Sequence, residues 1–462
     1  MVLKESKNKG RPKYKSKCTY CLNSFNCGKR SEEERLNGRA GNTDVEIIMS
    51  KLLEQINKEK RTPSILSDYI KIKHGFAFKG EYFSVQPTAD VLVTPGNFAI
   101  GGGFKADKFK YYRGSVPEDY ILKENDLIVT MTDLSVDADT LGYSALIPRD
   151  EKKRFLHNQR VGLVQKKKEG IDFGYLYYLM RTRPYQKYVV TTASGSTVKH
   201  TSPDRIASYE YDFPTLPIQK KIAEILSAYD AKIENNNKII KNLEAAAQAI
   251  FNEWFVKFRF PGYEKVKTKS RSELGSTTGM VESELGKIPE GWEVFKLKDI
   301  FTFVKGKKPN EVSEIQKEGF LQQILIDSFE GGKKLYANKE GMVVSSDEDL
   351  LMVMDGASSG RIEFGIIGIV GSTMSRLQLH RPIRSILYFY LKSKEKDIKD
   401  NTSGSAIPHT DKEKVYGYKI ALPNNTEYFE RILLNFIKGV EKLNYENISL
   451  KSQRDQLLAK LI

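Results

Sequence analysis

This chain has 462 residues, and the pattern in it that most resembles a set of metal ligands is formed by three cysteines near the N-terminus. Cys18, Cys21 and Cys27 could supply three zinc ligands, because short spacings of this kind let thiolates converge on one ion. A fourth ligand is missing nearby, since the first histidine is His74. The alternative is a set of free thiols in a mobile tail, and we predict no metal site.

Motifs for catalysis are incomplete throughout the sequence. The glycines of Gly101–Phe104 lack the spacing and the following helix of a phosphate-binding loop, so we interpret them as a flexible loop. The apolar run Leu350–Met354 before Asp355 resembles a Walker B strand without a Walker A partner, and a buried strand and turn is expected. The three carboxylates within Asp133–Asp139 could bind a metal but are typical of a solvated turn. The chain also lacks the Asn/Asp-Pro-Pro-aromatic segment of an adenine methyltransferase. We expect a protein that is not itself an enzyme.

Two segments rich in glycine, serine and histidine have the composition of an anion-binding loop. They are Ser194–Thr201 and Ser403–Thr410. Small residues let backbone N–H groups and hydroxyls approach phosphate closely, and lysine or histidine adds charge. An ordinary serine/threonine turn is the alternative. The candidate binding residues are Gly195, Ser196, Lys199 and His200 in the first segment and Gly404, Ser405 and His409 in the second.

Composition limits the class of protein that presents these loops. Hydrophobic residues make up 40% and aromatic residues 11%, which is too apolar for a largely disordered chain. No apolar run approaches the roughly 18 residues that span a bilayer. Few cysteines favour a reducing compartment, and we expect a cytoplasmic protein. The net charge of +15 favours a polyanionic partner, but the first 30 residues hold nine Lys/Arg against one acid and so carry more than half of it.

The elements that must position the loops follow one plan twice: a mixed α/β segment, then a long helix. Apolar residues recur every three or four positions in each helix, which is typical of a coiled-coil seam. Asn236 and Asn447 interrupt the two seams and could fix helix register, or could simply be exposed. We divide the chain into a basic extension (1–60), a first domain (61–214), a central helix (215–260), a linker (261–290), a second domain (291–423) and a distal helix (424–462).

The two halves also match in sequence. Leu66-Ser67-Asp68 returns as Leu297-Lys298-Asp299, 231 positions later, and Ser194-Gly195-Ser196 returns as Ser403-Gly404-Ser405, 209 later. Apolar residues of the two helices match best at 207. The order is kept while the offset shrinks, which indicates a duplicated unit whose second copy has lost loop segments. Paired antiparallel, the helices would form a rod of roughly 60 Å at 1.5 Å per residue.

Two longer stretches resemble the specificity (S) subunit of type I restriction–modification systems. One is Leu216-Pro217-Ile218-Gln219-Lys220-Lys221-Ile222-Ala223-Glu224-Ile225-Leu226, which continues to Trp254-Phe255. The other is Ser283-Glu284-Leu285-Gly286-Lys287-Ile288-Pro289-Glu290-Gly291-Trp292. The resemblance covers about Ile65 to Ile462 and excludes residues 1–60. The distal helix departs from the family pattern, because it begins Pro423-Asn424-Asn425-Thr426-Glu427.

The resemblance implies an α+β fold with two similar target-recognition domains separated by two long helices that form an antiparallel coiled coil with pseudo-twofold symmetry. It implies a non-catalytic subunit in which each domain reads one half of a bipartite, asymmetric double-stranded DNA target while the helices set the spacer. It also implies docking of two modification (M) subunits that use S-adenosylmethionine, and of restriction (R) subunits that use ATP and magnesium where these are present. A coiled-coil scaffold without sequence reading of its own is the alternative.

A second pair of loops would then contact DNA beside the glycine loops. Thr132 and Ser135 follow one predicted strand, and Ser358, Ser359 and Arg361 follow the matching strand. These loops differ in sequence, as loops that read different half-sites should. Arg361 is expected to contact a guanine, and Lys307 a phosphate.

Overall fold

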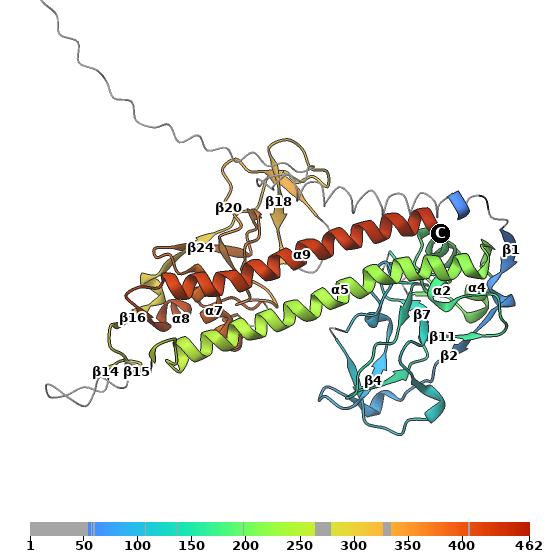
Figure 1. Cartoon of the computed structure of the whole chain (residues 1–462), viewed down its shortest axis with the longest axis horizontal. Coiled ribbons are helices and arrows are strands. Elements are labelled where there is room, and N and C mark those ends of the chain that lie inside the picture. Colours follow the sequence, from blue (N-terminus) through green and yellow to red (C-terminus); the bar gives the residue numbers. More distant parts are fainter. Residues whose placement is uncertain are drawn as a thin grey trace, which may run out of the picture. The chain divides into compact units, whose positions relative to one another are not determined.

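A computed structural model describes residues 54–56, 58, 61–106, 108–135, 137–196, 198–263, 279–326, 334–404 and 407–462. The cysteine cluster lies outside these residues. The chain divides into unit 1, Met1–Ile222 with Lys460–Ile462, and unit 2, Ala223–Ala459. The division falls inside the long helix α5 (Leu216–Phe251; Figure 1), which continues into a π-helical turn (Asn252–Val256). Among the described helices, none is long and apolar enough to cross a membrane.

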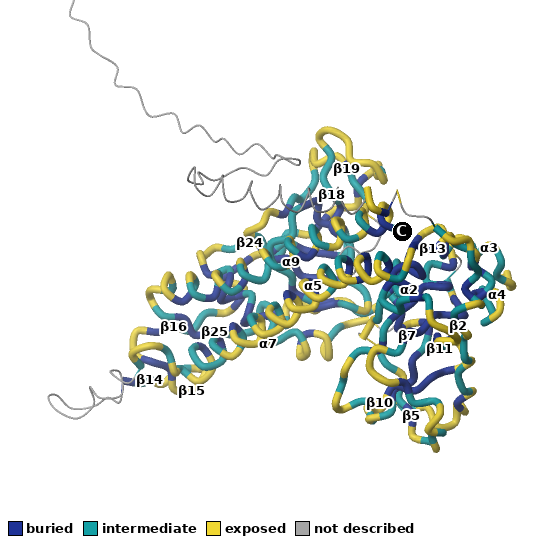
Figure 2. Tube along the Cα trace, turned by 45° about the vertical axis from the view of Figure 1, so that its right-hand side comes forward, coloured by how far each residue is buried: buried dark blue, intermediate teal, exposed yellow. Residues whose placement is uncertain are grey.

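Unit 1 is built on two sheets, and the central strands of both are buried along most of their length (Figure 2). An antiparallel sheet has the strand order β2 (Ile70–His74), β11 (Val161–Lys166), β7 (Leu127–Thr130), β9 (Ser144–Leu146). A mixed sheet has the order β3 (Phe83–Ser84), β5 (Lys110–Tyr112), β4 (Asp90–Val93), β10 (Arg154–His157), β6 (Ile121–Leu122). Two short ladders join β1 (Thr62–Ile65) to β13 (Glu210–Phe213) and β8 (Thr132–Asp133) to β12 (Lys199–His200). The helices are α2 (Phe173–Leu179), α3 (Arg183–Thr191) and α4 (Pro203–Ala207), with 3₁₀ turns at Leu66–Asp68, Gly80–Tyr82, Pro95–Asn97 and Glu118–Tyr120.

Unit 2 repeats this construction. Its antiparallel sheet has the order β17 (Phe301–Lys305), β24 (Met374–Leu379), β21 (Leu350–Val353), β22 (Ile362–Phe364). Its mixed sheet has the order β19 (Tyr336–Asn338), β18 (Phe320–Ile324), β23 (Gly368–Val370), β20 (Val344–Ser345). A further ladder joins β16 (Trp292–Lys296) to β25 (Lys419–Pro423). The helices are α7 (Arg384–Asp400), α8 (Lys412–Gly417) and α9 (Glu427–Leu461), with a 3₁₀ turn at Leu297–Asp299.

The predicted duplication is therefore visible strand by strand. The order β2-β11-β7-β9 in unit 1 is the order β17-β24-β21-β22 in unit 2, and each mixed sheet contains one parallel pair, β4–β10 or β18–β23. The run Leu350–Met354 is the buried strand β21 and a turn, as predicted, and its four strand residues are all buried. The fold class is α+β, with two similar domains and two long helices.

The equivalent residues of the two long helices differ from the sequence match by four positions. Gln219 of α5 accepts a hydrogen bond from the Asp172 N–H, 2.8 Å away, where α2 begins. Glu430 of α9 accepts bonds from the N–H groups of Ser385 (2.8 Å) and Ile386 (3.2 Å) where α7 begins. These equivalent residues are 211 positions apart, not 207. Four residues are about one helical turn, so apolar spacing matches almost as well at either offset.

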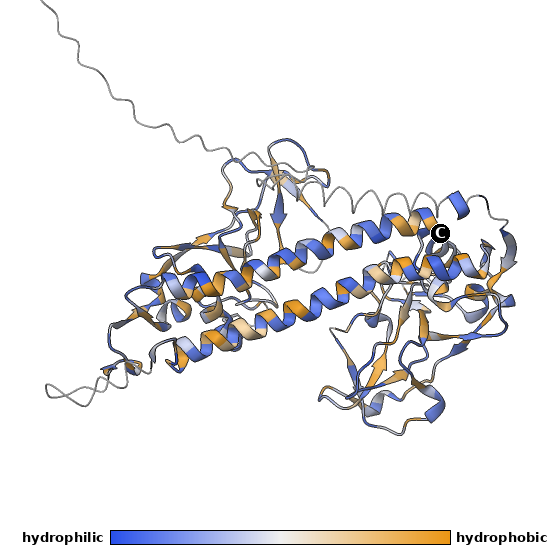
Figure 3. Cartoon of the chain, viewed as in Figure 1, coloured by the Kyte–Doolittle hydropathy of each residue, from blue (hydrophilic) through white to orange (hydrophobic). Residues whose placement is uncertain are grey.

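In unit 2, α5 and α9 pack antiparallel around a buried asparagine pair. The Asn236 amide donates to Asn447 Oδ1 at 3.0 Å, and the Asn447 amide donates to Asn237 Oδ1 at 2.9 Å. Asp230, earlier in α5, meets Arg454, later in α9, at 2.5 Å, which fixes the antiparallel direction. Hydrophobic and hydrophilic residues alternate along both helices (Figure 3). Asn236 and Asn447 are both buried, which supports the expectation that they fix the register of the helices and contradicts the alternative that they are exposed.

The segment expected to be a linker differs from that expectation at its end. Met280–Ser283 (β14) and Gly286–Pro289 (β15) form an antiparallel hairpin, and Ile288 is buried in the core of unit 2. The sequence motif Glu284-Leu285-Gly286 is its turn, where Gly286 has a φ of +82°. This positive φ suits glycine, and it explains why a segment with few large apolar residues still forms a defined element.

Removing the asparagine pair tests its role in unit 2. Asn236→Leu should lower the free energy of unfolding by about 1–3 kcal/mol, because Asn447 Oδ1 then lies buried without its donor. Asn236→Leu with Asn447→Leu should recover most of that loss, since neither buried amide then remains, and Asn237, which loses its donor, is exposed to water. Both tryptophans, Trp254 and Trp292, lie in unit 2, so tryptophan fluorescence during urea unfolding is the measurement. Exposed Asn235→Leu is the control, and equal loss in the single and double variants would contradict the pairing.

His157 is a buried titratable group in unit 1. It is fully buried in β10, and its Nε2–H donates to the Val161 carbonyl at 2.8 Å. Burial lowers the pKa of His157, because the charged form loses its hydration, and nearby Lys73 and His74 act in the same direction. Although the hydrogen bond to Val161 opposes them, the resulting pKa is about 4. The unfolded chain therefore binds a proton between about pH 6.5 and pH 4 that the folded chain does not bind.

Stability of unit 1 should fall as pH drops through this window. From pH 7 to pH 4.5 His157 should remove about 2–3 kcal/mol of unfolding free energy, at about 1.4 kcal/mol per pKa unit. His157→Leu should show a smaller pH dependence, although it is less stable at pH 7. Urea-dependent pulse proteolysis of unit 1 at the two pH values measures this. His200→Gln, at an exposed position in the same unit, should keep the wild-type pH dependence, and an unchanged dependence in His157→Leu would refute the assignment.

Candidate nucleic-acid interface

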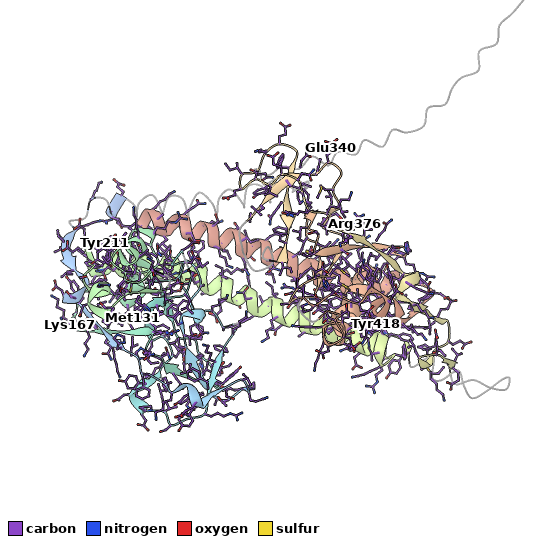
Figure 4. The ribbon with its side chains drawn as sticks, turned by 180° about the vertical axis from the view of Figure 1, so that it is seen from behind. Met131, Lys167, Tyr211, Glu340, Arg376 and Tyr418 are labelled. Atoms are coloured by element: carbon purple, nitrogen blue, oxygen red, sulfur yellow. The ribbon has the colours of Figure 1, made fainter. Side chains whose placement is uncertain are left out.

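In unit 1 the two predicted loops form one structure, the first loop pair (residues 131–135 with 194–196 and 198–201). The short ladder β8–β12 places Thr132 opposite His200 and Asp133 opposite Lys199. Ser194 and His200 exchange two backbone hydrogen bonds of 2.9 and 2.8 Å, which closes the glycine loop. The Thr201 N–H donates to the carbonyl of Met131, at the end of β7 (Figure 4), over 3.0 Å. Residues about 65 positions apart thus share one surface.

Unit 2 builds the same arrangement, the second loop pair (residues 354–361 with 403–404 and 407–410). Asp355 bridges to His409, and Ser403 and His409 exchange backbone bonds of 2.9 and 2.7 Å. The Thr410 N–H donates to the Met354 carbonyl at 2.7 Å, which matches Thr201 and Met131. Ser405 lies outside the described residues. The two loop pairs share a backbone arrangement while their side chains differ.

Glycine is required at the closed end of each loop. Gly195 has a φ of +98° and Gly404 a φ of +91°, which other residues rarely adopt. A Cβ at Gly195 would lie 2.0 Å from the Val198 carbonyl oxygen, and one at Gly404 would lie 2.4 Å from that of Ile407. Gly195, Ser196 and Gly404 are all exposed. Exposed backbone next to small side chains is the geometry that lets a phosphate approach.

A histidine occupies the same position in both loop pairs but has a different partner. His200 Nδ1 lies 3.1 Å from the Thr132 hydroxyl, and His409 Nδ1 lies 2.7 Å from Asp355 Oδ1. A carboxylate only accepts, so the His409 Nδ1–H is the donor and Nε2 is left for an added ligand. Asp355 was expected only as part of the turn after a strand, and its contact with His409 was not predicted. The repeat offset of 223 positions that relates Asp126 to Asp349 also relates Thr132 to Asp355, and that signal could have found it.

Asp133 organises the first loop pair from inside and is not part of a solvated turn. It is buried, and it accepts hydrogen bonds from the Ser135 N–H (2.7 Å), the Thr140 N–H and the Thr140 hydroxyl (both 2.6 Å). Burial by itself would raise the pKa of Asp133, but these hydrogen bonds outweigh it and hold the pKa below the usual value. Ser135 is therefore tied to the loop through its backbone. No group of three or more His, Cys, Asp or Glu residues in the described ranges is arranged to hold a metal ion.

Arg361 and Ser359 do not lie where the guanine and DNA contacts were expected. The Arg361 guanidinium pairs with Glu363 at 2.5 Å and lines a cavity of about 530 Å³, together with side chains of α5, α7 and α9. Its side chain is only 34% exposed, so a base edge would compete with this ion pair. Ser359 is buried, and its hydroxyl donates to the carbonyls of Gly356 (2.6 Å) and Pro408 (2.8 Å). It holds the two loops together and does not face solvent.

The other predicted residues differ in accessibility, and Thr132 is buried, with 3% of its surface exposed. Lys307 is exposed, and its Nζ donates to the Gly341 carbonyl at 3.1 Å. Ser358 and Lys199 are half-buried. The described surface of the second loop pair therefore includes His409, Ser358, the backbone at Gly404 and the side chain of Ile407, which is 56% exposed, with Lys307 as a separate cation.

Comparisons with known proteins relate both halves to one family. The model of the type I restriction modification DNA specificity domain matches residues 66–245 and 289–449. The type I restriction enzyme MjaVIII specificity subunit of Methanocaldococcus jannaschii is 31% identical over 183 residues, which are 38% of this chain and 43% of that protein. The MjaIX specificity subunit of the same organism is 24% identical over 317 residues, 64% of this chain and 69% of that one. The crystal structure of a type I restriction–modification S subunit from M. genitalium has a TM-score of 0.53 at 18% identity, covering 88% of this chain and 97% of that one, and supports the fold.

Neighbouring serines allow a matched test of the second loop pair. Ser359→Ala removes the donor to two loop carbonyls, so amide hydrogen exchange of residues 354–361 and 407–410 should speed up by about tenfold, as expected for roughly 1–2 kcal/mol of local stability. Ser358→Ala should leave exchange unchanged, because this hydroxyl has no comparable buried position. Mass spectrometry after proteolysis measures both. Equal exchange in the two variants would show that Ser359 does not hold the loops together.

Proposed function

Because the chain belongs to the family of type I restriction–modification DNA specificity proteins, we propose that it is the DNA-recognition subunit of such a complex and reads a bipartite, asymmetric target. The recognition domains are residues 61–214 and 291–423, and each reads one half of the target. Members of this family are specificity subunits and not themselves enzymes. Methyl transfer and cleavage then belong to partner subunits.

The observation that supports this proposal most is the duplicated loop pair with divergent side chains. The two copies share closed glycine loops and the histidine position, so they can meet the DNA backbone in the same way. They differ at Ser135 and Ser358, which are half-buried side chains that can address bases. They also differ in the partner of the histidine, which is buried Thr132 in one copy and Asp355 in the other. Two similar frames with different contact residues suit a target whose halves have different sequences. Arg361 is left out of this proposal because Glu363 already pairs with it.

The partners follow from the same scheme. Two copies of one M subunit, which uses S-adenosylmethionine, would dock on near-equivalent surfaces of the repeat, because a pseudo-twofold frame offers similar sites twice. R subunits with ATP and magnesium would join where they are present. The asparagine pair keeps α5 and α9 in one register, and we propose that these helices set the spacer between the half-sites.

Mapping of methylated adenines in cells with and without this chain tests the proposal. Loss of one bipartite motif is expected. A scaffold that does not read sequence, the alternative function, predicts an unchanged methylation pattern.

Histidine variants test which recognition domain reads which half of the DNA target. His200→Ala and His409→Ala in the reconstituted complex with its M subunits should each weaken DNA binding by about five- to thirtyfold, the range of one lost polar contact. Each should relax selectivity in a different half-site, because the two histidines belong to separate loop pairs. Binding to libraries randomised in one half at a time is the measurement. His380→Ala, at an exposed position that belongs to neither loop pair, is the control. If both histidine variants kept wild-type selectivity, the loop pairs would not be the reading surface.

A further inference from the structure

A third loop in unit 1 presents an exposed aliphatic side chain on a rigid support. Ile100 is 74% exposed at the tip of Ala99–Gly103. The Ala99 N–H donates to the Gly103 carbonyl at 3.0 Å and the Gly102 N–H to the Ala99 carbonyl at 2.9 Å. Gly101, Gly102 and Gly103 have φ values of +83°, +84° and +99°, and glycine tolerates these without strain.

A buried arginine braces this loop from beneath. Arg181 is only 6% exposed, its Nε donates to the Gly101 carbonyl at 3.0 Å, and its Nη1 donates to the Tyr177 hydroxyl at 2.8 Å. A Cβ at Gly102 would lie 2.5 Å from Arg181 Cγ. Burying a guanidinium costs free energy unless its hydrogen bonds are satisfied. The bonds from Arg181 to Gly101 and Tyr177 offset that cost and hold the loop in this position. The expectation of a flexible loop at Gly101–Phe104 was therefore wrong.

The base of the loop is held equally firmly. Asn97 is buried, and its side-chain amide donates to the carbonyls of Lys105 (3.1 Å) and Lys108 (3.0 Å). Its Oδ1 accepts from the Thr94 N–H at 2.9 Å, where β4 ends. The loop is pinned at its base and beneath its tip, while the Ile100 side chain extends into solvent.

The loop lies at the same end of the antiparallel sheet as the first loop pair. The Gly103 N–H donates to the carbonyl of Ser144, the first residue of β9, at 2.8 Å. Ser144 pairs with Val129 near the end of β7, and the chain leaves β7 into Thr132. A second exposed aliphatic side chain, Leu134 at 62%, follows in that same loop. Loop Ala99–Gly103 therefore faces the region where the first domain would meet DNA.

We infer that Ile100 is a specificity-determining residue of the first domain and contacts the 5-methyl group of a thymine in its half-site. This inference rests on the proposed function. An isoleucine side chain has no hydrogen-bonding group, and the thymine methyl is the apolar feature of the major-groove base edges. The rigid loop lowers the entropy lost on contact, which favours selective over adaptable binding. The half-site read by the first domain then contains a thymine whose methyl group contributes to binding.

Uracil substitution tests this contact atom by atom. In the half-site identified by methylation mapping, each thymine is replaced by uracil, and binding of the reconstituted complex is measured. One replacement should weaken wild-type binding by about three- to fivefold, the effect of one buried methyl group. Ile100→Ser should weaken binding to the thymine-containing DNA by a similar factor and lose the difference between thymine and uracil. Ile100→Leu should retain that difference.

Val85→Ser is the matched control, because Val85 is 93% exposed in the same unit but outside this loop. It should leave both binding and the uracil effect unchanged. If His200→Ala relaxes the half-site while no uracil position matters, the Ile100 inference fails and the proposed function stands. If neither His200→Ala nor Ile100→Ser changes binding, the first domain does not read DNA through this end of the sheet, and both fail. An undiminished uracil effect in Ile100→Ser would also overturn the inference.

Discussion

The buried pair of Asn236 and Asn447 is the constraint on which the arrangement of the long helices depends. Apolar seams alone allow two helices to slide by a turn, because residues three and four apart repeat along the whole length. One pair of buried amides removes this freedom, since any other register would leave hydrogen-bonding groups unpaired. The Arg454–Asp230 ion pair, about two turns away, agrees with the same register.

Each long helix is also tied to its own domain by one side chain at the same position of the repeat. Gln219 bonds to the backbone where α2 begins, and Glu430 bonds to the backbone where α7 begins. A carboxylate is well placed at a helix N-terminus, where unpaired N–H groups and the helix dipole favour negative charge. The amide in unit 1 and the acid in unit 2 thus perform the same structural task. Duplication preserved the attachment while the side chain changed.

In the loop pairs, too, the backbone arrangement is shared between the two units while the side chains differ. Closed glycine loops, paired backbones and a histidine recur, while the partner of that histidine changes from Thr132 to Asp355. In the proposed function, the common frame would keep the chain close to the DNA backbone, and the few side chains that differ would alter which bases are favoured. Loop Ala99–Gly103 extends this logic, because a rigid support lets one side chain act at a fixed place.

The sequence by itself determined the duplication, the α+β class, the two long helices and the glycine loops, because these depend on periodicity and on residue types with narrow conformational ranges. Only the tertiary structure decided the repeat offset of the helices, since 207 and 211 differ by about one turn and present similar apolar faces. The structure also showed that Arg361 pairs with Glu363 and that Ser359 and Asp133 are buried. It showed that the loop containing the glycines at 101–103 is held by a hydrogen bond from Arg181. The partners of a polar side chain come from segments distant in sequence, and no local pattern encodes which of them it meets.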